Sequence, residues 1–131
     1  MSSSILRYVV GVLNSSPIVS SMLSSRVYIN AAPMTPTRPY LTLQLIDDVP
    51  QMTLDGKANL SRARVQADIF ADTYYSAEEI CDSVEDAVVT DGDWAHRPLA
   101  GGRRSGLEAG IGLHRVSVDF ILWHIPHVTS P

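Results

Sequence analysis

Carboxylates and histidines are the side chains of this sequence that come nearest to a chemical site. Asp47, Asp48 and Asp55 fall near the end of an expected hairpin, and carboxylate oxygens are the ligands that a divalent cation prefers. His124 and His127 are only three positions apart, but zinc needs three or four converging ligands. Acidic residues at strand ends and isolated histidine pairs usually face water. We therefore predict no metal site.

Sequence patterns of calcium, phosphate and nucleophile sites are incomplete here. Asp91-Gly92-Asp93 resembles the start of a calcium loop, but the twelfth position, which needs a bidentate Glu, is Gly102. The glycine-rich residues 101–106 contain no Lys-Ser/Thr pair and lead into no helix, unlike a phosphate loop. No serine stands in a Gly-x-Ser-x-Gly elbow, and Cys81 lies beside an apolar helical stripe, where a buried thiol is ordinary. We predict no catalytic residue, no cofactor and no enzyme.

Composition is typical of a single folded domain over residues 1–131. Hydrophobic residues make up 45% and charged residues 18%, below the roughly 25% charged that is usual. A net charge of -4 lacks the basic excess with which general DNA-binding proteins bind phosphates. One cysteine cannot form an internal disulfide, and no apolar run approaches the roughly 20 residues of a membrane span. We expect a protein made in the cytoplasm, with no membrane partner.

Hydrophobic spacing predicts the elements of the first half of the chain. Apolar residues at helical spacing predict a helix over residues 5–14 and a second one that Pro17 opens. A short strand over 26–29 and a proline-rich connection over 32–39 follow. Alternating apolar residues predict a long hairpin of strands 40–46 and 61–70, with Asp47-Asp48-Val49-Pro50 ending the first strand and a turn at Asp55-Gly56-Lys57.

The second half predicts one helix and a closing strand. Ser76-Ala77-Glu78-Glu79 is a capping-box sequence that predicts a helix ending at Asp91-Gly92. We expect a strand over 94–100 to follow, broken by Pro98. A long strand over 113–125 comes after it and is central or covered by a partner. Residues 47–58 and 100–110 are predicted as flexible loops, and 125–131 as a short tail. These elements predict an α+β fold with a single mixed or antiparallel sheet and helices on one face.

The order of these features resembles one known family. The matching residues are Ser25-Arg26-Val27-Tyr28, Pro39-Tyr40-Leu41-Thr42-Leu43, the strand beginning Ala63-Arg64-Val65, the helix beginning Ser76-Ala77-Glu78 and the strand ending Phe120-Ile121-Leu122-Trp123. Together they span the chain from Ile5 to Trp123. The set resembles the tail terminator, or tail completion, proteins of long-tailed bacteriophages and related gene transfer agents.

This resemblance implies a structural virion protein at the head-proximal end of a tail, assembled in the host cytoplasm. It would cap the tail tube as a homo-hexameric ring, formed in solution or only on the tail, and join the tail to the DNA-filled head. The implied partners are the tail tube protein, a head-completion or stopper protein, and DNA that passes through without sequence-specific binding. Six copies at -4 each carry -24, and an acidic channel would let DNA slide.

Ring and partner contacts are the remaining candidate sites. We predict that the two loops become ordered on ring formation or docking and that two apolar side chains of the last strand pack against a partner. The alternatives are another head–tail connector or neck component, a monomeric binding module, or a small metal-dependent enzyme. The candidate interface residues are Asp47, Asp48, Asp55, Lys57, Arg103, Arg104, Ile121 and Trp123.

Overall fold

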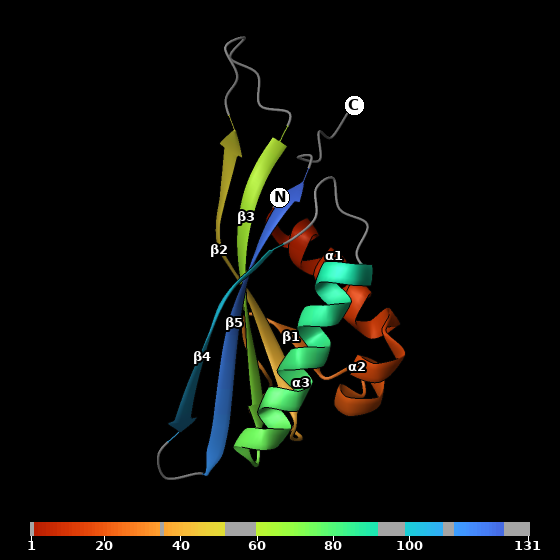
Figure 1. Ribbon diagram of the computed structural model, residues 1–131, viewed down its shortest axis with the longest axis vertical. Helices are drawn as coiled ribbons and strands as arrows, with labels where there is room; N and C mark the ends of the chain where they lie inside the picture. Colours follow the sequence, from red (N-terminus) through yellow and green to blue (C-terminus); the bar gives the residue numbers. More distant parts are fainter. Residues whose placement is uncertain (1, 35, 52–59, 92–98, 109–111, 125–131) are drawn as a thin grey trace.

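Five strands form one twisted mixed sheet, and the helices lie on one side of it (Figure 1). The computed structural model describes residues 2–34, 36–51, 60–91, 99–108 and 112–124. The strand order is β1-β2-β3-β5-β4, with β1 parallel to β2 and the other neighbours antiparallel. This confirms the predicted α+β fold. The elements are α1 (Ser2–Ser15), α2 (Pro17–Leu23), β1 (Val27–Ile29), β2 (Tyr40–Gln51), β3 (Leu60–Ala71), α3 (Tyr74–Asp86), a π-helical turn (Ala87–Asp91), β4 (Leu99–Glu108) and β5 (Leu113–His124).

The first two helices follow the sequence prediction closely. The side chain of Ser16 caps α2 by accepting a hydrogen bond from the Val19 amide at 3.5 Å, and Pro17 occupies the first turn. Ser24 ends α2 in the left-handed conformation, with φ of 48°. None of the helices in the described part of the chain is long and apolar enough to cross a membrane.

Helix α3 begins earlier than the capping-box sequence predicts. Thr73 is the N-cap residue, and its hydroxyl oxygen accepts a hydrogen bond from the Ser76 amide at 3.1 Å. Ser76 therefore lies inside the first turn instead of before it, because Thr73 already supplies the oxygen that the free amides need. The helix and its π-helical turn end at Asp91, as predicted.

The β2–β3 hairpin is longer than predicted. Leu45 pairs with Val65, and Asp47 pairs with Arg64, so Ile46 is an extra residue in a β-bulge. The strand continues through the bulge to Gln51, and the predicted end of the strand at Asp47–Pro50 is wrong. The predicted loop over 47–58 is therefore strand up to Gln51, and its remaining part, with Asp55 and Lys57, lies outside the described residues. In Figure 1 the upper ends of β2 and β3 extend beyond the helices.

The glycine-rich segment is a strand, so the predicted loop over 100–110 is wrong for residues 100–108. Residues 109 and 110 lie outside the described residues. Leu99–Glu108 forms β4 and pairs antiparallel with β5 along its length. Its register shifts between Ala100 and Gly102, and Gly102 has φ of 133°, a conformation that favours glycine. The backbone hydrogen bonds offered by β5 outweigh the low strand propensity of glycine. Residues 92–98 and 125–131 lie outside the described residues. Most of the predicted strand over 94–100 and the predicted tail over 125–131 fall in these ranges.

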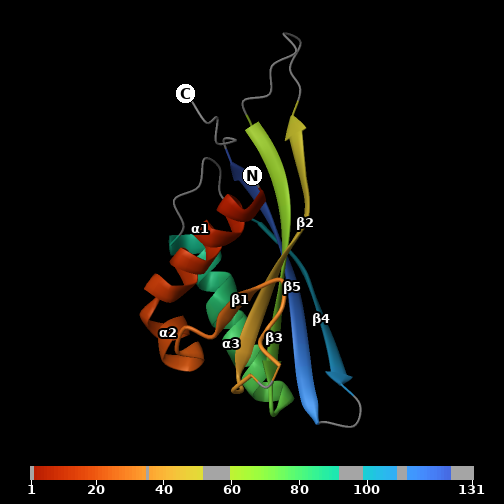
Figure 2. The same cartoon turned by 180° about the vertical axis from the view of Figure 1, so that it is seen from behind.

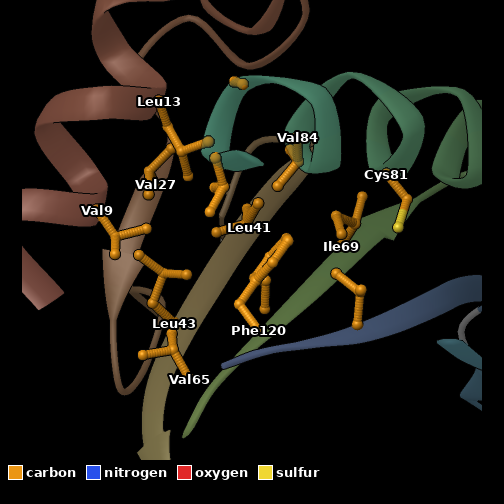
Figure 3. Packing of buried hydrophobic residues seen from close by; sticks show 14 of the residues in the cluster. Val9, Leu13, Val27, Leu41, Leu43, Val65, Ile69, Cys81, Val84 and Phe120 are labelled. Atoms are coloured by element: carbon orange, nitrogen blue, oxygen red, sulfur yellow. The ribbon is translucent and has the colours of Figure 1, made fainter. Parts of the chain in front are cut away.

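The core lies between the sheet and the helices. Figure 3 shows Val9 and Leu13 of α1 and Val84 of α3 facing side chains of β1, β2, β3 and β5. Alternate residues of β2, β3 and β5 point into this layer, and Phe120 of β5 is its largest fully buried side chain. Other fully buried strand residues are Leu41, Leu43, Val65, Ile69, Val116, Val118 and Leu122. We call this side of the sheet the helix-covered face.

Candidate assembly surface

The other side of the sheet has no covering layer in the part of the chain that the structure describes. Figures 1 and 2 show all the helices on the same side of the strands. Register and alternation place the remaining strand residues on the uncovered side, which we call the open face. Its residues include Tyr28, Tyr40, Thr42, Gln44, Asp47, Val49, Arg62, Arg64, Gln66, Asp68, Phe70, Gly102, Arg104, Gly106, Arg115, Ser117, Asp119, Ile121 and Trp123.

An ion-pair network crosses the open face from β3 to β4. The Asp119 carboxylate on β5 accepts hydrogen bonds from Arg64 Nη1 at 3.5 Å and from Arg104 Nη2 at 3.2 Å. The Asp119 side chain is 9% exposed, while Arg64 and Arg104 are 45% and 56% exposed. The carboxylate is therefore underneath, and the two guanidinium groups form the outer layer. Each guanidinium carries five N–H donors, so donors remain for a partner.

A second buried carboxylate is held beside the first. Asp68 Oδ1 on β3 accepts hydrogen bonds from Gln66 Nε2 at 2.9 Å and from the Ser117 hydroxyl on β5. Asp68 and Ser117 are 8% and 5% exposed, although no helix covers them. The neighbouring side chains of the open face bury these groups, and their hydrogen bonds keep the surface ordered.

Removing the Asp68 carboxylate should destabilise the protein. We expect Asp68→Ala to lower the free energy of unfolding by about 1–3 kcal/mol, because it leaves the buried Ser117 hydroxyl without its acceptor. Chemical denaturation measures the change. Asp68→Asn keeps an acceptor oxygen and should lose less, and Asp68→Ala/Ser117→Ala should lose less than the sum of the single changes. Equal losses for Asp68→Ala and Asp68→Asn would contradict this account.

Aromatic and apolar side chains stand at the two ends of the open face. At one end Tyr40 stacks on Phe70, with ring centroids 4.8 Å apart, and Tyr28 of β1 lies 6.3 Å from Tyr40. At the other end the apolar Ile121 and Trp123 of β5 are both half-buried. Aromatic residues and arginine are enriched at protein–protein interfaces. The open face therefore has the composition of a protein interface.

Arg103 belongs to the opposite side of the sheet. Its Nη2 atom donates to Asp82 Oδ1 at 2.9 Å, and its Nε atom donates to Glu85 Oε1 at 3.1 Å. Both acceptors are on α3, so the side chain ties the edge strand β4 to the helix. The hydrogen bonds to Glu85, the largest cause, and to Asp82 raise the pKa of Arg103, and it stays charged.

We expect Arg103→Ala to destabilise the folded protein by about 1 kcal/mol, since partly exposed ion pairs contribute little individually but this one joins two elements. The loss should shrink at high salt, which screens the pairs. Thermal unfolding at 0.05 and 1 M salt measures both effects. Arg103→Lys should retain part of the stability. A loss that does not change with salt would contradict the ionic origin.

The structure brings together half of the predicted interface residues. Asp47, Arg104, Ile121 and Trp123 lie on the open face, with Asp47 and Ile121 in register on either side of Arg64. Asp48 pairs with Ala63 and so falls on the other side of the sheet, like Arg103. Asp55 and Lys57 lie outside the described residues.

The sequence reasoning missed the residues at the centre of the open face. Arg62, Arg64, Asp68 and Asp119 occupy the polar positions of alternating strands, and none of them is among the predicted interface residues. The available signal was that these charged positions alternate with apolar ones on two strands, which predicts a polar sheet face without a helix over it.

The described residues give no support for a metal site or a reactive nucleophile. No group of three His, Cys, Asp or Glu side chains there could hold a metal ion. Cys81 is a buried residue of α3, and its thiol lies 3.8 Å from Glu85 Oε1. Burial, with smaller contributions from Glu85 and Asp82, raises the pKa of Cys81 to about 12.

This raised pKa predicts a thiol that does not react in the folded protein. The folded thiol stays protonated up to a pH of about 12, while the unfolded thiol ionises near its ordinary pKa of 9.0. Its contribution to stability is therefore complete below pH 9 and is lost as the pH rises towards 12. We expect a disulfide reagent at pH 8 to label the folded protein at least about 100-fold more slowly than the unfolded chain. Fast labelling of the folded protein would contradict this expectation.

Comparison with known proteins identifies the family. The model of the family described as "Tail completion protein gp17" matches residues 7–124. The chain belongs to this tail completion family. It is therefore a structural protein of a phage tail, and the resemblance seen in the sequence is confirmed. No curated protein sequence matches the chain.

A solved structure has the same fold. The chain is similar to one from the virion of a native gene transfer agent particle, with a TM-score of 0.72 and 17% sequence identity. The match covers 90% of this chain and 92% of the other.

Proposed function

We propose that this protein caps the tail tube as a homo-hexameric ring and forms the surface on which the DNA-filled head docks. The family match over residues 7–124 is the observation that carries the proposal. In this role the protein binds its own copies, the tail tube protein and a head-completion protein, and it catalyses no reaction. The role places it at the head-proximal end of the tail, after synthesis and assembly in the host cytoplasm.

Two properties of the chain support a ring through which DNA passes. The open face is an ordered surface of suitable composition for subunit contacts, with its buried carboxylates already hydrogen-bonded. Each copy carries a net charge of -4, so six copies carry -24. A ring with this charge repels the phosphate backbone and lets DNA slide through without sequence-specific binding.

Deletion of the gene that encodes this protein tests this function. We expect electron micrographs to show filled heads without tails and free tails of irregular length, because nothing ends tube growth or joins the tail to the head. Wild-type protein supplied in trans should restore joined particles. Free tails of normal length beside unjoined heads would instead indicate another head–tail connector or neck component. Joined particles of normal length would overturn the proposal.

A further inference from the structure

The two broad faces of the molecule differ in the charges that they present. The open face carries four arginines, Arg62, Arg64, Arg104 and Arg115, against three aspartates. Two of the aspartates, Asp68 and Asp119, are buried beneath the surface. A partner that lies on this face therefore meets mainly guanidinium groups.

Helix α3 presents the opposite charge on the other side of the molecule. It contains five carboxylates and no lysine or arginine. Tyr75, Glu79, Asp82 and Asp86 fall at i, i+4, i+7 and i+11 and are all exposed, so they form one stripe on the solvent-exposed side of α3. We call these four residues the acidic stripe. Asp82 also binds Arg103 within the chain, which neutralises part of the charge.

This arrangement favours contact between unlike faces of two copies. A two-fold contact between two open faces would place arginines opposite arginines, which repel each other. A contact between one copy's open face and the next copy's acidic stripe places guanidinium groups opposite carboxylates. The open face and the acidic stripe are on opposite sides of a two-layer molecule. A copy that uses one of them in a contact can therefore use the other in a second contact. Such head-to-tail contacts generate closed rings when the rotation between copies is suitable.

We propose that the open face of one copy docks on the acidic stripe of α3 of the next copy. This inference rests on the proposed ring and gives its subunit contact. Arg62, Arg64 and Arg104 lie against Glu79, Asp82 and Asp86 of the neighbour, and the exposed ring of Tyr75 packs among the half-buried side chains of the open face. The contact uses charge for orientation and apolar area for affinity.

Charge reversal on each side tests the contact through rescue. Arg62→Glu/Arg64→Glu reverses the open face, and Glu79→Lys/Asp86→Lys reverses the acidic stripe. We expect each variant alone to yield at least about tenfold fewer joined particles than wild type in the deletion background. Co-expression of the two variants should restore joining, because alternating copies make every contact complementary. The chain that carries all four changes should also assemble.

Rescue also excludes misfolding, since two unfolded variants cannot restore each other. The control Arg7→Glu makes a charge change of the same sign on α1, outside both surfaces, and should join particles normally. Normal joining by either double variant alone would overturn the inference. Failure of the co-expressed pair would also overturn it and would indicate that the open-face arginines bind something else, such as DNA in the channel. Both of these results concern the subunit contact alone. The proposed function itself fails only if joined particles still form after the gene is deleted.

Discussion

Phe120→Ala should lower the free energy of unfolding by about 3–5 kcal/mol, the largest stability loss that we expect from a single truncation in this chain. Phe120 has no exposed surface and lies on β5, between β3 and β4 and beneath the helices (Figure 3). Its removal leaves a cavity at the centre of the core. Small domains are stable by only about 5–15 kcal/mol, so this variant would be partly unfolded under mild denaturation.

Chemical denaturation of Phe120→Ala and of Tyr75→Ala provides the comparison. Tyr75 is also aromatic, but it is 83% exposed on α3, so its truncation should change stability by less than about 0.5 kcal/mol. Similar losses in the two variants would contradict the assignment of the core to the helix-covered face.

Ile121→Asp should abolish most particle assembly while the protein remains folded. Ile121 is half-buried on the open face, in register with Arg64, and no element within the described residues covers it. If a subunit covers this face, a carboxylate there is desolvated in the complex. We expect at least a 30-fold loss of joined particles, about the change in affinity that 2 kcal/mol produces at an interface.

A matched substitution elsewhere distinguishes an effect specific to the open face from the effect of adding a charge anywhere on the surface. Ile18 on α2 is 58% exposed, and Ile18→Asp adds the same charge outside both proposed contact surfaces. Ile18→Asp should leave the yield of joined particles unchanged. If both variants assemble normally and both are stable, the open face is not an assembly surface.

Much of the fold was predictable because most elements are determined by local patterns. Apolar residues at helical spacing predicted α1, and Pro17 with its apolar neighbours predicted α2. Alternation predicted β3 and β5, whose fully buried apolar residues all lie on the helix-covered face. The helix-covered face follows from these patterns, since one apolar side of each strand must meet the apolar stripes of the helices.

The errors concern segments that depend on distant partners. Residues 100–110 contain glycines and two arginines that predict a loop, but β5 supplies backbone partners and α3 supplies carboxylates for Arg103. The end predicted at Asp47 was wrong because a bulge at Ile46 lets the strand continue. Neither effect has a local sequence signal.

The candidate surface was predictable only in part for a related reason. Ile121 and Trp123 could be predicted because apolar residues occupy both sides of the last strand. Arg64 and Asp119 form an ion pair only because β3 and β5 lie side by side in the sheet. The two residues are 55 positions apart in the chain. A charge network that spans three strands becomes recognisable in the register of the sheet.

The mass of the assembled protein tests the central claim most directly. Native mass spectrometry or light scattering should be measured over a wide concentration range, with and without tubes of its tail tube protein. We predict a hexamer, either in free solution or only where tube ends act as a template that raises the local concentration. A protein that stays monomeric at all concentrations and does not bind to the tubes would contradict the ring.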